Sequence, residues 1–414
     1  MNFFTRLRVS SALRVLPFSL VLVVFYYGKN GSSPGGVDYA PTLVSEALGT
    51  MYSFAYAVVS GLGVWEGGKL RQNGLWSVGA GRSRFHIAAL TLVPAILLAW
   101  LMLLSPVVLL LCERRVLPDP GSLLPLGMAM LLCIAHASIG FGIGLRLPHL
   151  IAAPLMVVLV WIVVAFSWTV EPNWVRHLFG QYPTTLMFGE RATVHSLMPH
   201  ILLTGGIAAS MWLLWLPLSR SSIRVTLACL AALGAVGGSW AMVHTWTFNP
   251  PLLTGAAPVE CAGRSPRVCM PRVTASRLPE VRDQMTSVLD DFRAAGVTRR
   301  PALISDTLND GRFSVRSTAR TWHVPLTVIA DKGNSRYQFA LSAVRFPCRR
   351  PDPFTGAVVQ AWVARVTDEG AAYRKTTKPQ QGVEAEVARV AAMSVPEQAK
   401  WFRNSLVEGC ERGA

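Results

Sequence analysis

Long apolar segments alternate with short polar connections over the first 246 residues, and mixed polar sequence follows to residue 414. A helix needs roughly 20 predominantly apolar residues to cross about 30 Å of hydrocarbon, and the segments are close to that length. The seven segments are 12–28, 43–65, 87–111, 122–144, 150–168, 197–217 and 226–246. The pattern predicts an all-α polytopic membrane bundle of about seven transmembrane helices over residues 1–246.

A different kind of sequence follows the last apolar segment. Residues 247–260 contain a Pro/Gly-rich stretch and are predicted to be a linker. Residues 261–414 are predicted to form a separate, water-compatible domain. We therefore expect a helix bundle followed by one small domain.

The C-terminal domain is predicted to be α+β. Helices are expected at about 278–295 and 354–369, and the capping-box pattern beginning at Ser394 starts a third. The runs 325–330 and 337–344 are predicted to be two strands joined by a turn.

Lys and Arg predict the orientation of the bundle. With the N-terminus inside, ten basic residues lie near the inner ends of the segments and only five near the outer ends. The inner residues are Arg6, Arg8, Arg14, Lys69, Arg71, Arg82, Arg84, Arg146, Arg220 and Arg224. The bias predicts a multi-pass protein of the plasma membrane, with a cytoplasmic N-terminus and an extracytoplasmic C-terminal domain. A cleaved signal peptide is the alternative for the first segment, but no A-x-A-like site follows it.

Four of the seven cysteines lie in the C-terminal domain, at Cys261, Cys269, Cys348 and Cys410. An even number outside the cell suits two disulfides, for which three pairings are open. We favour Cys261 with Cys269 and Cys348 with Cys410 on compactness alone. A zinc site is the alternative, although the C-x7-C spacing is wide and His323 is the only imidazole nearby.

Motifs for catalysis are absent from the sequence. It has no phosphate-binding P-loop, no H-E-x-x-H and no G-x-S-x-G. The apolar segments hold almost no ionisable groups apart from Glu46 at an edge and His136, which we interpret as a packed or hydrogen-bonded histidine. We expect no enzyme activity, no cofactor and no bound metal.

The net charge of +16 divides about equally between the two parts of the chain and includes no dense basic run. That distribution argues against a nucleic-acid partner, and topology with anionic membrane lipid explains the charge of the first part.

The connection after the second segment combines aromatic and basic residues. One interpretation is an interfacial loop, with tryptophans in the headgroup layer and cations facing acidic lipid. The other is a docking element for a further subunit. The candidate docking residues are Trp65, Lys69, Arg71, Trp76, Arg82 and Arg84.

Two segments contain pairs of small residues that allow helix backbones to approach closely. They are Gly140 with Gly144 in the fourth segment and Gly234 with Gly238 in the seventh. We expect packing within the chain, and a dimer face is the alternative.

Three stretches carry a family resemblance. Residues 64–76 with 82–84 are similar to a cytoplasmic coupling segment, and 140–155 resembles the turn between the fourth and fifth helices of the same family. The tail, with its cysteines and the stretch 394–401, resembles a domain of unknown function appended to such proteins. Together these stretches resemble permease subunits of type 2 ABC exporters, in the diverged form common in high-GC actinobacteria.

The resemblance implies transmembrane export driven by a separate ABC ATPase subunit docked at about residues 66–86. It further implies a homodimer or a second permease subunit as a partner. The usual permease has six spans with both ends inside, so a seven-span chain departs from the family. The alternative hypothesis is a non-transporting membrane protein whose external domain binds a partner or a cell-envelope ligand.

Overall fold

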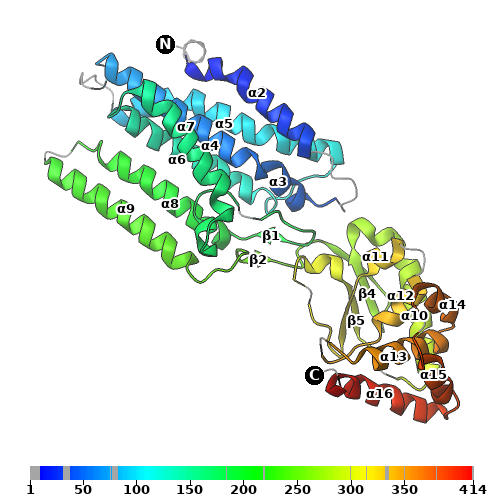
Figure 1. The fold of residues 1–414 in the computed structure, drawn as a ribbon. Helices are drawn as coiled ribbons and strands as arrows, with labels where there is room; N and C mark the ends of the chain where they lie inside the picture. The colour runs from blue at the N-terminus through cyan, green and yellow to red at the C-terminus, as the bar shows by residue number, and fades with distance from the viewer. Residues whose placement is uncertain are drawn as a thin grey trace. The chain divides into compact units, whose positions relative to one another are not determined.

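The computed structural model describes residues 10–30, 38–74, 76, 83–182, 184–217, 220–298, 300–313, 315–331, 335–348, 350–378 and 380–412. The chain divides into two compact units, Met1–Thr254 and Gly255–Ala414 (Figure 1). The stretch predicted as a linker, 247–260, contains one short strand of the first unit and the beginning of a strand of the second.

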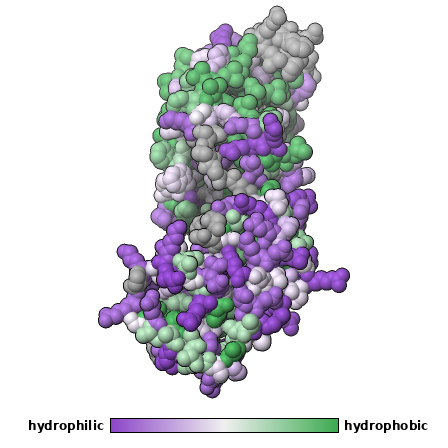
Figure 2. Space-filling view, turned by 90° about the vertical axis from the view of Figure 1, so that its right-hand side faces the viewer, coloured by the Kyte–Doolittle hydropathy of each residue, from purple (hydrophilic) through white to green (hydrophobic). Residues whose placement is uncertain are grey.

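The first unit is a bundle of helices, whose surface in Figure 2 is largely hydrophobic, whereas that of the second unit is mostly hydrophilic. Among the described residues, six helices are long and apolar enough to cross a membrane, or seven when the bent pair α3 and α4 counts as one. The helices are α2 (Ser11–Asn30), α3 (Ala40–Gly49), α4 (Met51–Gln72), α5 (Arg84–Arg114), α6 (Leu124–Gly144), α7 (His149–Phe166), α8 (Val194–Leu213) and α9 (Ser221–Val243). Each of the seven predicted segments overlaps one of these helices or the bent pair.

The second predicted segment, 43–65, differs from the structure in two ways. It is broken at Thr50, where α3 and α4 meet at an angle of 49°. Its helix also continues to Gln72, so the expected connection from residue 65 is helical at its beginning. The length of an apolar run indicates that a helix can span the membrane, but it does not show whether that helix is straight. Gly49 and Thr50 are both poor helix formers, which favours a break at this position.

Helices α4 and α6 pack with almost no space between their backbones. A Cβ atom added at Gly140 would lie 2.2 Å from the carbonyl oxygen of Ser60, and one at Gly144 would lie 2.1 Å from that of Val64. Both predicted glycines of the fourth segment therefore lie in a contact within the chain that only glycine permits.

The close contact is reciprocal. On α4, a Cβ atom at Gly63 would lie 2.4 Å from the carbonyl oxygen of Ala137, and one at Gly67 would lie 2.5 Å from that of Phe141. The four glycines alternate across the helix pair, which fixes the axial register of α4 against α6.

The predicted pair on α9 behaves differently. No atom lies within 4 Å of a Cβ atom added at Gly234, and one at Gly238 would meet only a methyl group of Leu202 at 3.1 Å. The tightest approach to α9 is made by Gly206 of α8, where a Cβ would lie 2.3 Å from that of Ala235. Gly234 thus faces away from the rest of the unit.

The segment between α7 and α8 enters the bundle. It contains the short 3-10 helices η1 (Ser167–Thr169) and η2 (Asn173–His177), and strand β1 (Arg191–Ala192), which pairs antiparallel with β2 (Leu252–Leu253). The Tyr56 hydroxyl donates to the carbonyl of Gly180 at 3.0 Å, and the Gly180 N–H donates to Nδ1 of His200 at 3.0 Å. We call residues 167–192 the plug segment.

His136 lies inside α6 and is packed as predicted. Its ring stacks on Tyr56 with centroids 4.8 Å apart, and its Nδ1 lies 3.3 Å from the Ser60 hydroxyl. The histidine is therefore a hydrogen-bonded part of the interior.

The second unit contains a four-stranded sheet in the order β3-β4-β5-β6. Strands β3 and β4 are antiparallel, whereas β4, β5 and β6 are parallel, which places α10 in the crossover between β4 and β5. The strands are β3 (Val259–Ala262), β4 (Arg267–Pro271), β5 (Leu303–Asp306) and β6 (Thr321–Val324). The helical elements are η3 (Arg272–Arg277), α10 (Leu278–Ala294), η4 (Thr307–Asp310), α11 (Leu326–Asp331), α12 (Ser335–Ser342), α13 (Pro353–Val366), α14 (Gly370–Thr376), α15 (Val383–Ala391) and α16 (Val395–Arg412).

The two strands predicted at 325–330 and 337–344 are wrong, because the structure has helices α11 and α12 there. The buried carboxylate of Asp306, at the end of β5, accepts a hydrogen bond from the backbone N–H of Thr327 at 2.9 Å. It thereby satisfies one of the free N–H groups in the first turn of α11. Burial raises the pKa of Asp306 above its usual value. The hydrogen bonds that its carboxylate accepts from the Thr327 hydroxyl and from nearby backbone N–H groups partly offset that rise.

Two disulfides join the favoured cysteine pairs. Cys261 and Cys269 lie opposite each other on β3 and β4, with sulfurs 2.06 Å apart. Cys348 and Cys410 connect the chain before α13 to the last turns of α16, with sulfurs 2.09 Å apart. The second bridge closes 62 residues of sequence, so it ties the end of the unit to its middle.

Candidate docking site at the basic end of the bundle

Four parts of the bundle meet around a pocket of about 520 Å³. They are the connection after α4, the start of α5, the end of α6 with the turn that follows it, and the turn between α8 and α9 with the helix ends beside it. The side chains that matter most here are Trp76, Arg84, Arg146, Trp215 and Arg224. We call this the basic pocket.

The arginines of the basic pocket come from three different places in the sequence, the start of α5, the turn after α6 and the first turn of α9. Arg84 and Arg146 are exposed, Arg224 is half-buried, and no acidic residue is among the described side chains that line the pocket. Within the described part of the chain, neither Arg146 nor Arg224 forms an ion pair. Three guanidinium groups close together, with no acidic residue among the described side chains beside them, attract an anionic group of another molecule.

Aromatic side chains form the inner wall of this pocket. The ring of Trp76 meets Phe141 and Trp215 edge to face, with centroids 5.6 Å and 5.4 Å apart. The guanidinium of Arg84 lies 5.7 Å from the Trp76 ring centroid, within range of a cation–π contact. Trp76 is therefore fixed to the bundle and positions a charge on its outer face.

Three of the predicted docking residues are engaged inside the bundle. Trp65 lies within α4 and packs edge-on against His149, with ring centroids 4.7 Å apart. Arg71 donates to the backbone carbonyl of Arg146 at 2.6 Å, which holds the turn between α6 and α7 against α4. Lys69 belongs to a partly buried hydrogen-bonded network. Arg82 lies outside the described residues, so of the six candidates Trp76 and Arg84 line the basic pocket.

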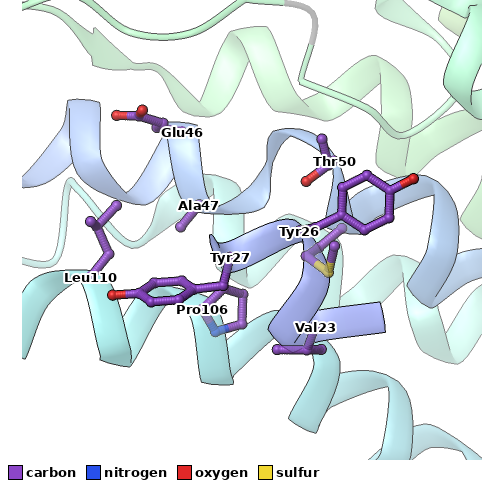
Figure 3. Close-up of a pocket in the computed structure, with 9 residues that line it drawn as sticks. Val23, Tyr26, Tyr27, Glu46, Ala47, Thr50, Pro106 and Leu110 are labelled. Atoms are coloured by element: carbon purple, nitrogen blue, oxygen red, sulfur yellow. The ribbon is translucent and has the colours of Figure 1, made fainter. Parts of the chain in front are cut away.

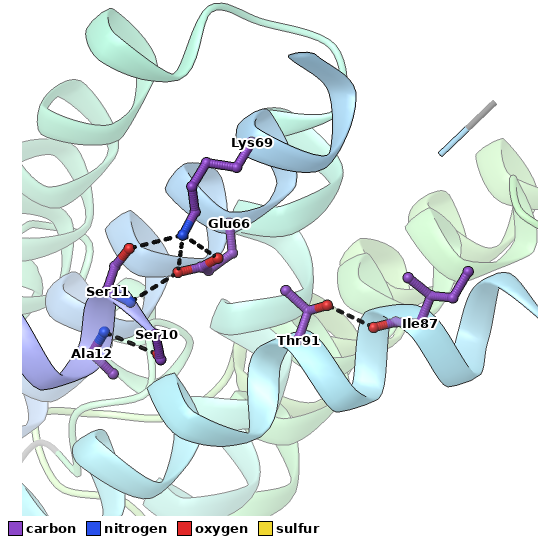
Figure 4. A network of polar contacts seen from close by, with 7 residues as sticks. All are labelled: Ser10, Ser11, Ala12, Glu66, Lys69, Ile87 and Thr91. Atoms are coloured by element: carbon purple, nitrogen blue, oxygen red, sulfur yellow. Dashed lines mark hydrogen bonds and ion pairs between the residues drawn. The ribbon is translucent and has the colours of Figure 1, made fainter. Parts of the chain in front are cut away.

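The network around Lys69 ties the first helix to α4 (Figure 4). Glu66 is only 8% exposed, and its carboxylate accepts hydrogen bonds from the backbone N–H of Ser11 at 3.2 Å and from the Lys69 ammonium at 2.9 Å. Lys69 also donates to the Ser11 hydroxyl at 3.1 Å. Glu66 and Lys69 thus form an ion pair that contacts the beginning of α2.

Sequence reasoning counted Arg146 and Arg224 among the inner basic residues but did not include them in the site. A usable signal was present, because alternating spans bring every inner connection to the same end of a bundle. The residues of one loop were considered alone, although the pocket is assembled from several.

At the opposite end of the bundle, two arginines have acidic partners. Arg114 lies 3.8 Å from Asp38, and Arg191 forms an ion pair with Asp119. These cations close connections within the chain and are not available to a partner.

A second cavity lies at the bend between α3 and α4 and is too small for a substrate (Figure 3). Its volume of about 20 Å³ is close to that of one water-sized probe. Tyr26, Tyr27 and Thr50 line it, and the carboxylate of Glu46 extends away from the tyrosines in Figure 3. Among the described residues, no group of three or more His, Cys, Asp or Glu side chains is placed to hold a metal ion.

Comparison with known proteins gives one match. Residues 268–410, all within the second unit, match the model of a family described as a domain of unknown function, DUF7224. No curated protein matches the chain. No solved structure matches it either.

Proposed function

We propose that the protein is the membrane subunit of an ABC-type transport system, in which a separate subunit hydrolyses ATP and docks at the basic pocket. The observation that carries this proposal is the convergence of Arg84, Arg146 and Arg224 without an acidic residue among the described lining side chains. In this proposal the basic end is cytoplasmic and the disulfide-bonded unit lies outside the plasma membrane, in agreement with the positive-inside bias.

The position of the basic pocket would allow a docked ATPase to move several helices of the bundle. A partner bound there touches the connection after α4, the start of α5 and both later turns at once. An acidic surface on the ATPase complements the three guanidinium groups and orients the encounter. Movement of that surface then displaces several helices together, which is what a coupled transporter requires.

The plug segment supplies the opposite gate in this proposal. Hydrogen bonds from Tyr56 and to His200 hold Gly180 inside the bundle. A net contribution of about 0.5–1.5 kcal/mol for each such bond lies within what a bound ATPase can overcome. Because the bundle interior is mostly apolar, we propose a hydrophobic or amphipathic solute as cargo.

The test is affinity purification of the tagged protein from its native membrane in mild detergent, followed by mass spectrometry. We expect a stoichiometric ATP-binding cassette subunit with the unaltered protein and its loss in a variant carrying Arg84→Glu, Arg146→Glu and Arg224→Glu. Arg115→Glu, an exposed arginine after the far end of α5, is the matched control and should retain the subunit.

Two results would contradict the proposal. One is recovery of the ATPase with the triple variant at the level of the control. The other is repeated absence of any ATPase while the bait remains intact, which would leave the C-terminal unit as the functional part.

A further inference from the structure

The second unit contains a groove of about 810 Å³ that the proposed transport function does not use. Its floor is formed by the buried rings of Phe292, Trp322 and Phe402, and its rim includes Leu406 and Val407 of α16. The volume lies in the range of small-molecule sites, and the lining combines apolar and aromatic walls with the polar side chains of Thr298, Ser317, Thr318, Arg345 and Arg403.

Arg345 is the unusual member of the lining. Its guanidinium lies 4.7 Å from the Trp322 ring centroid, and its Nε is buried without a hydrogen-bond partner. Among the described residues it forms no ion pair. Burial lowers the pKa of Arg345 to about 10, because desolvation disfavours the charged form. A cation kept at this cost, and still charged at neutral pH, is suited to an incoming anion.

The remaining charge around the groove has the same sign. Arg403, exposed on α16, is the other charged residue among the described lining side chains, and none of them is acidic. A ligand that fits must therefore bring a negative charge to Arg345 and an apolar body to the aromatic floor.

The disulfide between Cys348 and Cys410 joins the two sides of this groove. Arg345 and Phe346 precede Cys348 on one side, and Leu406 and Val407 precede Cys410 on the other. The bridge limits how far α16 can move from the segment that carries Arg345, so the groove is held open in a fixed shape.

We propose that this groove binds an amphiphile with one anionic head group, a carboxylate or a phosphate, and an alkyl or isoprenoid body. The head group pairs with Arg345, and the body lies over Phe292, Trp322 and Phe402. The groove lies wholly within the second unit, so this proposal does not depend on ATPase docking.

The test uses the full chain in nanodiscs of zwitterionic lipid and a photoreactive dodecanoic acid as the probe. Mass spectrometry then identifies the labelled peptides. We expect labelling at residues 317–322 and 402–407 that unlabelled dodecanoate and dodecyl phosphate displace. Dodecanol, dodecyltrimethylammonium and inorganic phosphate should displace it at least tenfold less well, because each lacks either the anion or the chain.

Arg345→Gln should raise the half-saturating concentration about tenfold or more, through loss of one charge-assisted contact. Arg272→Gln is the matched control, since Arg272 is an exposed arginine of the same unit that pairs with Glu260 at 3.4 Å. Val407→Trp adds bulk at an exposed rim position and should block labelling without loss of thermal stability, which provides a test if Arg345→Gln fails to fold.

Equal labelling of Arg345→Gln and the unaltered protein would overturn the proposal, as would labelling of Val407→Trp at the original level. Displacement by inorganic phosphate alone would show an anion site without an apolar requirement and would also overturn it. None of these results changes ATPase recovery, so the two proposals fail independently.

Discussion

Two helix pairs in the bundle, α4 with α6 and α8 with α9, meet through small residues in different ways. In the first pair, glycines on both helices lie against carbonyl oxygens of the partner, at distances that exclude even a methyl group. In the second, one glycine of α8 meets Ala235, and Gly234 of α9 meets nothing within 4 Å. The spacing of small residues is similar in α6 and α9, so spacing alone does not determine which surface they contact.

The difference shows that two helices approach closely only where both carry small residues at the contact. Gly140 and Gly144 approach α4 because Gly63 and Gly67 open the facing surface. No such reciprocal glycine pair faces Gly234. In a membrane, where apolar burial does not favour one helix over lipid, this reciprocity supplies the van der Waals contact that holds helices together.

The largest effect is expected from Gly144→Leu. Its side chain would collide with the backbone carbonyl of Val64, which lies 2.1 Å from the position of Cβ and cannot turn aside. We expect a loss of about 3 kcal/mol or more, seen as lost folded protein by size-exclusion chromatography and a lower melting temperature in detergent. Gly234→Leu is the matched control, and a comparable loss there would break the comparison.

A smaller loss is expected from Gly63→Ala. The added methyl group would lie 2.4 Å from the carbonyl oxygen of Ala137, so α4 and α6 must separate slightly. Overpacking of this kind costs about 1–3 kcal/mol. Thermal unfolding in detergent measures it, and an unchanged midpoint would mean that the two helices are not locked in register.

Gly206→Ala should have a moderate effect that can be reversed. The clash is with the Cβ of Ala235, and exchanging the two residues by adding Ala235→Gly restores the space. We expect a coupling energy of about 1 kcal/mol in a double-mutant cycle of thermal stabilities. Purely additive losses would indicate that α8 and α9 do not contact each other at these residues.

The smallest effect is expected from Gly234→Ala. Nothing lies within 4 Å of the new methyl group, and Ala favours a helix interior over Gly by up to about 1 kcal/mol. The melting temperature should stay constant or rise. A clear fall, accompanied by a change in oligomeric state, would show that this face of α9 packs against something other than lipid.

The helices of the bundle could be predicted because an apolar run of sufficient length is a local property. An apolar run does not show where a helix bends or which residues it contacts. The bend at Thr50 and the continuation of α4 to Gln72 were therefore not predicted. Helix α10 was also predictable from its own sequence, because Pro at the start and Gly after the end mark its limits.

The parts that could not be predicted depend on distant residues. The run from Leu326 is apolar and short enough to suit either strand or helix, and Asp306 of another element supplies the hydrogen bond that starts α11. The basic pocket was only partly predicted for the same reason. Arg84 belongs to the predicted docking segment, residues 66–86, whereas only the fold brings Arg146 and Arg224 close to it.

The contact between Ser11 and Glu66 has a consequence for the biogenesis of the protein. The two residues are 55 positions apart, so the first helix is synthesised before the carboxylate that it contacts. Removal of α2 would take from the Glu66 carboxylate the Ser11 N–H and from the Lys69 ammonium the Ser11 hydroxyl, leaving Glu66 and Lys69 paired, among the described residues, only with each other. The contact therefore gives the beginning of the first apolar segment a structural role, because its loss would leave a buried carboxylate with one fewer hydrogen bond.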